Sequence, residues 1–324
     1  MLTACLIVHN EASVLARCLT SLMPWVDACC VVDSGSTDGT VDLARQFGAR
    51  VQVMPTLADA RGRLIDFAAA RNAALAMVRD GWVLSIDADE VLAIRDRAEW
   101  RRLIRRRDLQ AIELVILSGG TRWYVPRVFR KQPWSTWRGR VHEWIALREP
   151  TCRTDCATLT NQPDKTGKES AVERDLRLCA VALRDDPDDL RAVFYHARAL
   201  RLAKRHAEAI PLYLRYWREA EFQAGRYTAV LGAATCALLM HDLEASRRYA
   251  MVAYRLDPAL AEACCVLGDV ALGMGRADLA IGWFERALHK RLPGIAQALF
   301  VDESCYGPYP RERLRWIRER LQAR

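Results

Sequence analysis

The sequence predicts two domains: an α/β domain with a mostly parallel sheet, followed by an all-α domain of helical repeats. Two observations predict this division. Over roughly the first hundred residues, short apolar runs alternate with amphipathic helix patterns, which is typical of a parallel sheet covered by helices. From about Ser170 onward the pattern is helical throughout and repeats itself. A chain of 324 residues is also long enough for about two domains of roughly 150 residues each.

The first domain is expected to place several polar residues at one edge of its sheet. The expected strands are residues 2–8, 28–32, 50–54 and 82–86, and the expected helices are residues 11–22, 40–47 and 63–79. Ligands of such sheets bind beyond the carboxyl ends of the strands. Polar residues that follow Val8, Val32 and Ile86 would therefore lie together. Residues 112–117 and 122–128 are expected to be the last strands, and the aromatic and basic stretch 134–145 to form loops over the site.

The second domain shows the spacing of tetratricopeptide repeats. Ala209, Ala245 and Ala280 are 36 and 35 residues apart, close to the repeat length of about 34. The segments 193–216, 229–258 and 261–292 share the offsets of small and large residues. Small residues at these offsets let paired helices approach, so that each unit packs on the next. A capping helix is expected at residues 314–321.

The boundary between the domains is expected in a polar segment that contains Pro150, Pro163 and Gly167. We therefore predict a first domain over residues 1–150, a linker over 151–172 and the repeats over 173–324.

Charge, cysteines and hydropathy exclude several classes of protein. The net charge of +8 is divided evenly between the two halves, which argues against nucleic acid as a partner. The basic run 101–107 is expected to be a solvated helix face, with contact to anionic lipid or a phosphorylated acceptor as the alternative. The 11 cysteines lack the spacing of a disulfide framework. Without a signal peptide or a long apolar run, we expect a cytoplasmic protein, with peripheral attachment to the inner face of a membrane as an alternative.

Asp87 and Asp89 are the strongest candidates for chemistry. They follow the expected strand 82–86, and residues two apart in an extended chain face the same way. Neighbouring carboxylates raise each other's pKa unless they share a cation. Such oxygen ligands suit Mg²⁺ or Mn²⁺, which also bridge the phosphates of a substrate. The alternative is a solvated acidic turn, because an isolated DxD motif is a weak signal.

Four ordered blocks resemble the signature of family 2 glycosyltransferases, which have the Rossmann-like GT-A fold. These blocks are residues 6–11, 31–40, 66–75 and 87–90. Two later blocks, residues 126–130 and 139–143, resemble a subgroup with C-terminal tetratricopeptide repeats. That subgroup includes enzymes similar to bacteriocin S-glycosyltransferases and relatives of lipopolysaccharide core transferases. The resemblance implies an inverting sugar transfer from a nucleotide-diphosphate sugar.

The resemblance also implies roles for individual residues. The nucleotide sugar would contact Val8, Asn10, Glu11, Asp33, Arg71 and Asp87. Asn72 would help to shape the pocket. Asp89 and Asp87 would hold Mn²⁺ or Mg²⁺ with His142 as a further ligand, although His142 could instead be a hydrogen-bonded structural histidine.

Glu143 is the candidate catalytic base. Its alternative role is a salt bridge to Arg140 or Arg130. One departure from the family pattern stands out: relatives commonly have a histidine where this chain has Asn161 and Gln162.

We therefore predict a metal-assisted hexosyltransferase of family 2. We expect the donor to be a UDP-sugar. The expected acceptor is a peptide or protein side chain, a glycolipid or a polysaccharide. The repeats would position the acceptor or form a homodimer. The alternative is a tetratricopeptide binding scaffold with an inactive glycosyltransferase-like domain. A nucleotidyltransferase would need a glycine-rich loop where this chain has His9, Asn10 and Glu11.

Overall fold

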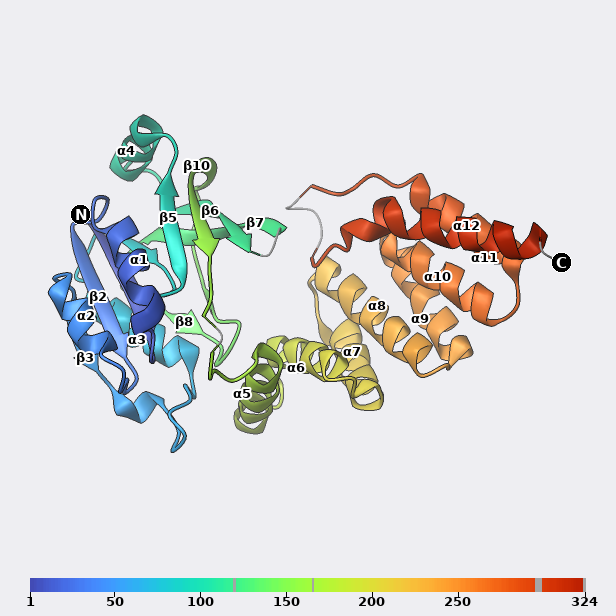
Figure 1. The fold of residues 1–324 in the computed structure, drawn as a ribbon, viewed down its shortest axis with the longest axis horizontal. Coiled ribbons are helices and arrows are strands. Elements are labelled where there is room, and N and C mark those ends of the chain that lie inside the picture. The colour runs from blue at the N-terminus through green and yellow to red at the C-terminus, as the bar shows by residue number, and fades with distance from the viewer. Residues whose placement is uncertain (119–120, 165, 295–298, 323–324) are drawn as a thin grey trace. The chain divides into compact units, whose positions relative to one another are not determined.

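The computed structural model describes residues 1–118, 121–164, 166–294 and 299–322. The chain divides into two compact units, Met1–Ser170 and Ala171–Arg324 (Figure 1). The first unit contains the sheet and the second unit is helical, so the predicted order of the two fold classes is confirmed.

The first unit is built on an eight-stranded sheet with the order β3-β2-β1-β4-β7-β6-β10-β5. Strands β3, β2, β1 and β4 run parallel, while β7 is antiparallel to both β4 and β6. The strands are β1 (Leu2–Val8), β2 (Ala28–Asp33), β3 (Arg50–Val53), β4 (Trp82–Ser85), β5 (Glu90–Ile94), β6 (Ala111–Ser118), β7 (Thr121–Arg130) and β10 (Thr151–Asn161). A separate two-stranded ribbon pairs β8 (Trp137–Arg138) with β9 (Trp144–Ile145).

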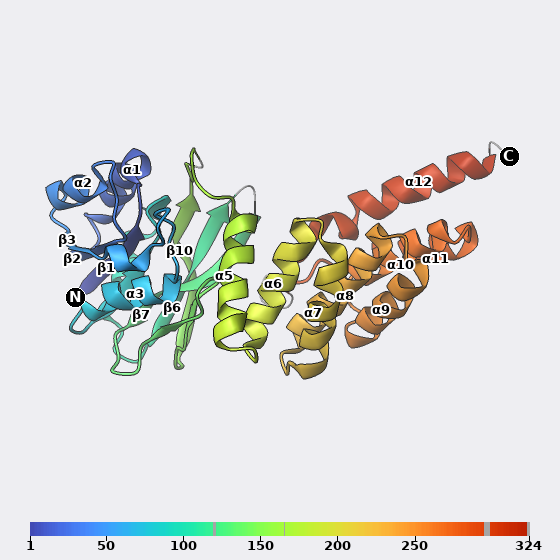
Figure 2. The same cartoon turned by 90° about the horizontal axis from the view of Figure 1, so that it is seen from below.

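Helices cover both faces of the parallel part of this sheet (Figure 2). They are α1 (Ala12–Leu22), α2 (Thr40–Gln46) and α3 (Phe67–Ala76), while α4 (Arg97–Arg105) packs against β10. Alternate residues of β1 point to opposite faces. Leu6 therefore packs in one core with residues of α1, α2 and α4, whereas Cys5 packs in the other core with residues of α3. These two cores fix the strand ends that carry the candidate site.

Three expectations for the first unit differ from the structure. The predicted linker 151–172 begins too early, because Thr151–Asn161 is strand β10, which pairs with both β5 and β6. The predicted helix 63–79 begins four residues later, at Phe67, because the Asp66 side chain accepts a hydrogen bond from the Ala69 N–H at 2.8 Å and caps it. Strand β5 was not predicted.

The second unit consists of antiparallel helix pairs. Helix α5 (Ala171–Asp185) precedes the pairs α6 (Leu190–Leu202) with α7 (His206–Glu219), α8 (Gln223–Leu239) with α9 (Leu243–Leu256), and α10 (Glu262–Gly273) with α11 (Ala277–Leu288). The small residues Ala209, Ala245 and Ala280 are all buried, which confirms the tetratricopeptide-like repeat. The chain ends in the 3₁₀ turn η2 (Glu303–Tyr306) and the helix α12 (Pro308–Gln322), which packs on α11 as the predicted cap.

The repeat depends on close contact between the two helices of a pair, as Gly268 shows. A Cβ at Gly268 of α10 would lie 2.6 Å from Cζ of the buried Phe284 of α11. A Cβ at the exposed Gly282 of α11 would meet nothing within 4 Å. The two glycines therefore make a matched pair for testing this packing.

We expect Gly268→Ala to lower the stability of the helical unit by about 1–3 kcal/mol, because the ring of Phe284 must move. The control Gly282→Ala should instead stabilise α11 by about 0.5–1 kcal/mol. Thermal unfolding of the full chain, followed by far-UV circular dichroism, measures both. Equal stability of the two variants would contradict this packing.

Candidate active site

The carboxyl ends of β1, β2 and β4 meet at one edge of the sheet, and polar residues follow each of them. Val8 of β1 lies opposite Asp33 of β2 in the register. The Val8 side chain is buried in the core, while its carbonyl oxygen accepts a hydrogen bond from the Ser34 N–H at 3.1 Å. Val8 can therefore face a ligand only through its backbone. The predicted gathering of these strand ends is present.

Asp33 and Asn10 organise the loop between β2 and α2. The fully buried Asp33 carboxylate accepts hydrogen bonds from the N–H groups of Gly35 at 2.8 Å and Ser36 at 2.9 Å, and from the Ser36 hydroxyl. Asn10 has a positive φ of 52° and accepts a hydrogen bond from the Thr37 N–H at 2.8 Å. Both side chains thus hold the loop, and their contact with a nucleotide stays a prediction.

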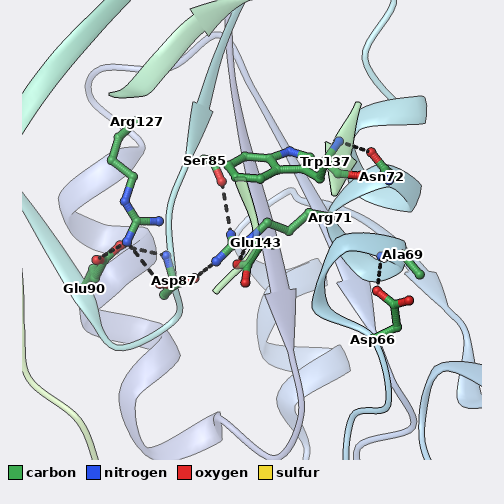
Figure 3. Close-up of polar contacts among 10 residues, drawn as sticks. All are labelled: Asp66, Ala69, Arg71, Asn72, Ser85, Asp87, Glu90, Arg127, Trp137 and Glu143. Carbon is green, nitrogen blue, oxygen red and sulfur yellow. Dashed lines mark hydrogen bonds and ion pairs between the residues drawn. The ribbon is translucent and has the colours of Figure 1, made fainter. Parts of the chain in front are cut away.

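Asp87 is clamped between two arginines (Figure 3). Its Oδ1 accepts a hydrogen bond from Arg71 Nη2 at 2.7 Å, and its Oδ2 accepts one from Arg127 Nη2 at 3.2 Å. Burial alone would raise the pKa of Asp87, but the guanidiniums of Arg71 and Arg127 hold it well below its usual range. The two arginines therefore favour the anionic form of Asp87, and both of its carboxylate oxygens accept hydrogen bonds.

Arg127 and Glu90 extend this clamp, and neither was predicted as a site residue. Arg127 Nη2 also donates to Glu90 Oε1 at 2.7 Å, and Glu90 Oε2 accepts from the Asp87 N–H at 2.9 Å. Burial raises the pKa of Glu90 to about 7, with Arg127 opposing and Asp87 adding to the shift. The signal in the sequence was their place in the motif blocks, with Glu90 in residues 87–90 and Arg127 in residues 126–130.

Glu143 pairs with Arg71, a partner that the sequence did not suggest. Arg71 Nε donates to Glu143 Oε1, and Arg71 Nη1 donates to Ser85 Oγ at 3.1 Å. Arg140, one of the two predicted partners, instead lies 3.5 Å from Asp66. Arg71 is nearly buried, with only 8% of its side chain exposed, so it joins Asp87 of the sheet edge to Glu143 of the later block.

The prediction that Asp87 and Asp89 face the same way assumed an extended chain, but the structure has a turn between these two residues. The chain turns after Asp87, since the Glu90 N–H donates to the Asp87 carbonyl oxygen at 3.0 Å. The side chain of Asn161 in β10 lies beside the Asp89 carboxylate. Burial and the neighbouring charge of Asp87 raise the pKa of Asp89, while Asn161 and Lys168 oppose the shift.

Glu11 lies in the same electrostatic surroundings as Asp89. Its pKa is raised by burial and, in smaller part, by the charge of Asp89. Lys168 opposes this shift, with its Nζ 2.6 Å from Glu11 Oε2. Lys168, which lies in the segment that follows β10, thus opposes the rise in pKa of both Glu11 and Asp89.

The described ranges contain no group of three or more His, Cys, Asp or Glu side chains able to hold a metal ion. Asp87, Asp89 and His142 are therefore not brought together as a set of three ligands. The chemistry of Asp89 still suits a divalent cation, because a carboxylate crowded by negative charge gains from one. Mg²⁺ commonly uses one or two protein carboxylates, with waters and substrate phosphates as its other ligands.

The ribbon β8–β9 is fixed to α3 and carries the partly buried Trp137 and the exposed Trp144, while Trp134 lies in the segment before it. Asn72 bonds the backbone of Trp137 twice, accepting from its N–H at 2.8 Å and donating to its carbonyl at 2.9 Å. Trp137 packs edge-on against Phe129, and so belongs to the core. Trp134 and Trp144 are 46% and 39% exposed and can offer an aromatic face to a ligand.

We expect Arg71→Met to lower the free energy of unfolding by about 3–5 kcal/mol, because it leaves Asp87 and Glu143 without their shared cation. The double variant Arg71→Met/Glu143→Gln should recover part of this loss. As a control, Arg45→Met removes an exposed pair with Asp42 and should change stability by less than about 0.5 kcal/mol. Urea unfolding of the full chain tests this, and an Arg71→Met variant as stable as the control would contradict the clamp.

Comparison with known proteins relates the first part of the chain to glycosyltransferases. Residues 3–130 match the family model described as "Glycosyl transferase family 2". A TPR repeat-containing protein of Synechococcus elongatus is 35% identical over 147 residues, which cover 44% of this chain and 34% of that protein. An uncharacterized glycosyltransferase of Rickettsia felis is 38% identical over 101 residues, covering 31% of this chain and 33% of that protein.

The SPbeta prophage-derived glycosyltransferase SunS of Bacillus subtilis is 24% identical over 226 residues, covering 64% of this chain and 51% of that protein. The chain thus spans between a third and a half of the length of these relatives. No helix in the part of the chain that the structure describes has both the length and the apolar character needed to cross a membrane. Over residues 3–130 the first unit is thus similar to family 2 glycosyltransferases, and a second unit of tetratricopeptide-like repeats follows it.

Proposed function

We propose that the first unit transfers a sugar from a nucleotide-diphosphate sugar to an acceptor, with inversion at the anomeric carbon and the help of Mn²⁺ or Mg²⁺. One observation carries this proposal. At the edge of the sheet, Asp87 is fixed by Arg71 and Arg127, while Asp89 beside it lies near the negative charge of Asp87 and, among the described residues, forms no ion pair with either arginine. Such an arrangement suits a diphosphate that arrives with a divalent cation.

The donor would lie across the ends of β1 and β2. Asn10, Glu11 and Asp33 are the proposed contacts for the nucleoside, with Asn10 and Asp33 shaping the loop that follows β2. Arg71 acts on the donor through Asp87, because its guanidinium is almost buried and already bonded to Asp87, Glu143 and Ser85. A UDP-sugar, and a hexose as the sugar, are the first candidates.

Asp89 would hold the cation, with diphosphate oxygens completing the coordination. We propose His142 as a further ligand of the cation. A bound cation would stabilise the negative charge that develops on the leaving diphosphate. Asp87 is better suited to position the turn than to bind the cation directly, because both of its oxygens already accept hydrogen bonds from arginine.

In the transfer step, an acceptor oxygen, nitrogen or sulfur forms the bond to the anomeric carbon. The bond from that carbon to the diphosphate oxygen breaks, and the electron pair leaves with the diphosphate. Glu143 is the proposed general base, which takes the proton from the attacking group of the acceptor. Arg71 orients this carboxylate by holding Oε1.

The acceptor is proposed to be a peptide or protein side chain, a glycolipid or a polysaccharide. The exposed rings of Trp134 and Trp144 could stack on a sugar of such an acceptor. We further propose that the protein acts in the cytoplasm or at the inner face of a membrane. The repeats would recruit the acceptor or pair two copies of the chain.

We expect Asp89→Asn to lower Mn²⁺-dependent sugar transfer or donor hydrolysis on the order of 10²-fold or more, because the leaving charge loses its stabilisation. The fold should persist, since Asp89 makes no ion pair among the described residues. A screen of UDP-, GDP- and TDP-sugars with Mn²⁺ provides the activity. Asp42→Asn, on an exposed carboxylate of α2, is the matched control and should retain full activity.

Calorimetric titration with the nucleoside diphosphates in Mn²⁺ and in EDTA completes the test. Metal-dependent binding that Asp89→Asn abolishes supports the transferase. Full activity of Asp89→Asn would overturn the assignment of the metal ligand. Absence of any metal-dependent nucleotide binding by the unmodified protein would favour the alternative, a tetratricopeptide scaffold with an inactive glycosyltransferase-like domain.

A further inference from the structure

The first helices of the three repeat pairs, α6, α8 and α10, are contacted by the chain's own residues 299–306. Phe300 stacks on Phe194 of α6 with ring centroids 6.3 Å apart. The Leu299 carbonyl oxygen accepts a hydrogen bond from Thr228 of α8 at 3.2 Å. Glu262 of α10 accepts hydrogen bonds from the Asp302 N–H at 3.1 Å and the Tyr306 hydroxyl at 2.9 Å. Residues 299–306 of the chain therefore already occupy the face formed by α6, α8 and α10.

A different hollow of the repeats lies between the second helices α9 and α11, with α10 as its base. It encloses about 610 Å³, within the range of roughly 300–1,000 Å³ that is usual for ligand sites. Its floor is apolar and includes Met251, Met274, Leu279 and Trp283. Leu279 is 47% exposed, so its side chain is accessible to a ligand in this hollow. We call this hollow the α9–α11 groove.

The α9–α11 groove is lined by four arginines and no acidic residue: Arg247, Arg248, Arg255 and Arg276. Two of them are offset by exposed neighbours, because Arg247 pairs with Glu244 at 3.2 Å and Arg276 with Asp278 at 3.1 Å. Arg248 and Arg255 make no ion pair within the ranges that the structure describes. The groove therefore carries uncompensated positive charge beside an apolar floor.

The spacing of these two arginines indicates the shape of the ligand. Arg248 and Arg255 are seven residues apart on α9, so they lie on the same side of the helix, roughly 10 Å apart along its axis. A peptide with two carboxylates at about that distance and large apolar side chains between them would satisfy both the charges and the floor. The two methionines can adapt to apolar side chains of different shape.

We infer that the α9–α11 groove binds an acidic peptide segment of a partner protein, with Arg248 and Arg255 meeting its carboxylates and the floor taking its apolar side chains. A polynucleotide is a poorer match, because only Trp283 among the floor residues could stack on a base. This binding site is separate from the transferase site, and it does not depend on the first unit being active.

The test uses the full chain and a phage library of random twelve-residue peptides. The library is first depleted on immobilised Leu279→Glu, which changes an exposed side chain and should leave the fold intact, and is then selected on the unmodified chain. We expect the survivors to be enriched in Asp and Glu together with Leu, Ile, Phe or Met. A synthetic survivor carrying fluorescein is then titrated by anisotropy.

We expect the dissociation constant of that peptide to rise at least about tenfold in Arg248→Glu/Arg255→Glu and in Leu279→Glu. The control Arg184→Glu/Arg218→Glu reverses two exposed arginines elsewhere on the repeats and should stay within about twofold. Circular dichroism checks that all variants are folded.

Three outcomes would overturn the inference. No peptide survives depletion; the survivors show no excess of acidic residues; or a single-stranded oligonucleotide binds with the same dependence on Arg248 and Arg255 but without dependence on Leu279. None of these results would bear on sugar transfer, which is measured separately with Asp89→Asn.

Discussion

The salt bridge between Arg71 and Asp87 is the interaction on which the rest of the site depends. Arg71 comes from α3, Asp87 from the end of β4, and Glu143 from the segment before β9, so one guanidinium joins three distant parts of the chain. An unpaired charge at so buried a position would be costly. The pairing with Arg71, reinforced by Arg127, removes that cost and fixes the turn that carries Asp89.

This arrangement gives Asp87 and Asp89 different surroundings and suits them to different roles. Equivalent carboxylates would both compete for a cation, but two arginines already satisfy Asp87, and its anionic form is strongly favoured. Asp89 has a raised pKa and a neighbouring amide, Asn161, which leaves it able to gain from a divalent cation. We therefore propose that Asp87 serves as a structural anion and that Asp89 binds the cation.

Much of the fold followed from local patterns in the sequence. The buried parallel strands β1, β2 and β4 are continuous apolar runs. The regular spacing of Ala209, Ala245 and Ala280 indicates the repeats. Strand β10 escaped prediction because it is rich in threonine and has charged residues at exposed positions, so it resembles a polar linker. Its pairing with β5 and β6, both distant in sequence, is what makes it a strand.

Some residues of the candidate site stood out in the sequence, but the contacts between them did not. Asp87, Asp89, Arg71 and Glu143 stood out by their motifs, yet no local pattern could show that Arg71 pairs with Glu143. The roles of Arg127 and Asn161 depend on β7 and β10 lying next to β4 and β5 in the folded sheet. Only the tertiary structure brings these side chains to the aspartates.

The most direct measurement of the central claim is a crystal structure of the chain with UDP and Mn²⁺, with the metal located by its anomalous scattering. The account predicts an Asp89 carboxylate oxygen within about 2.2 Å of Mn²⁺, while Asp87 remains bonded to Arg71 and Arg127. Mn²⁺ bound by Asp87, with the bond to Arg71 broken and Asp89 turned away, would contradict it.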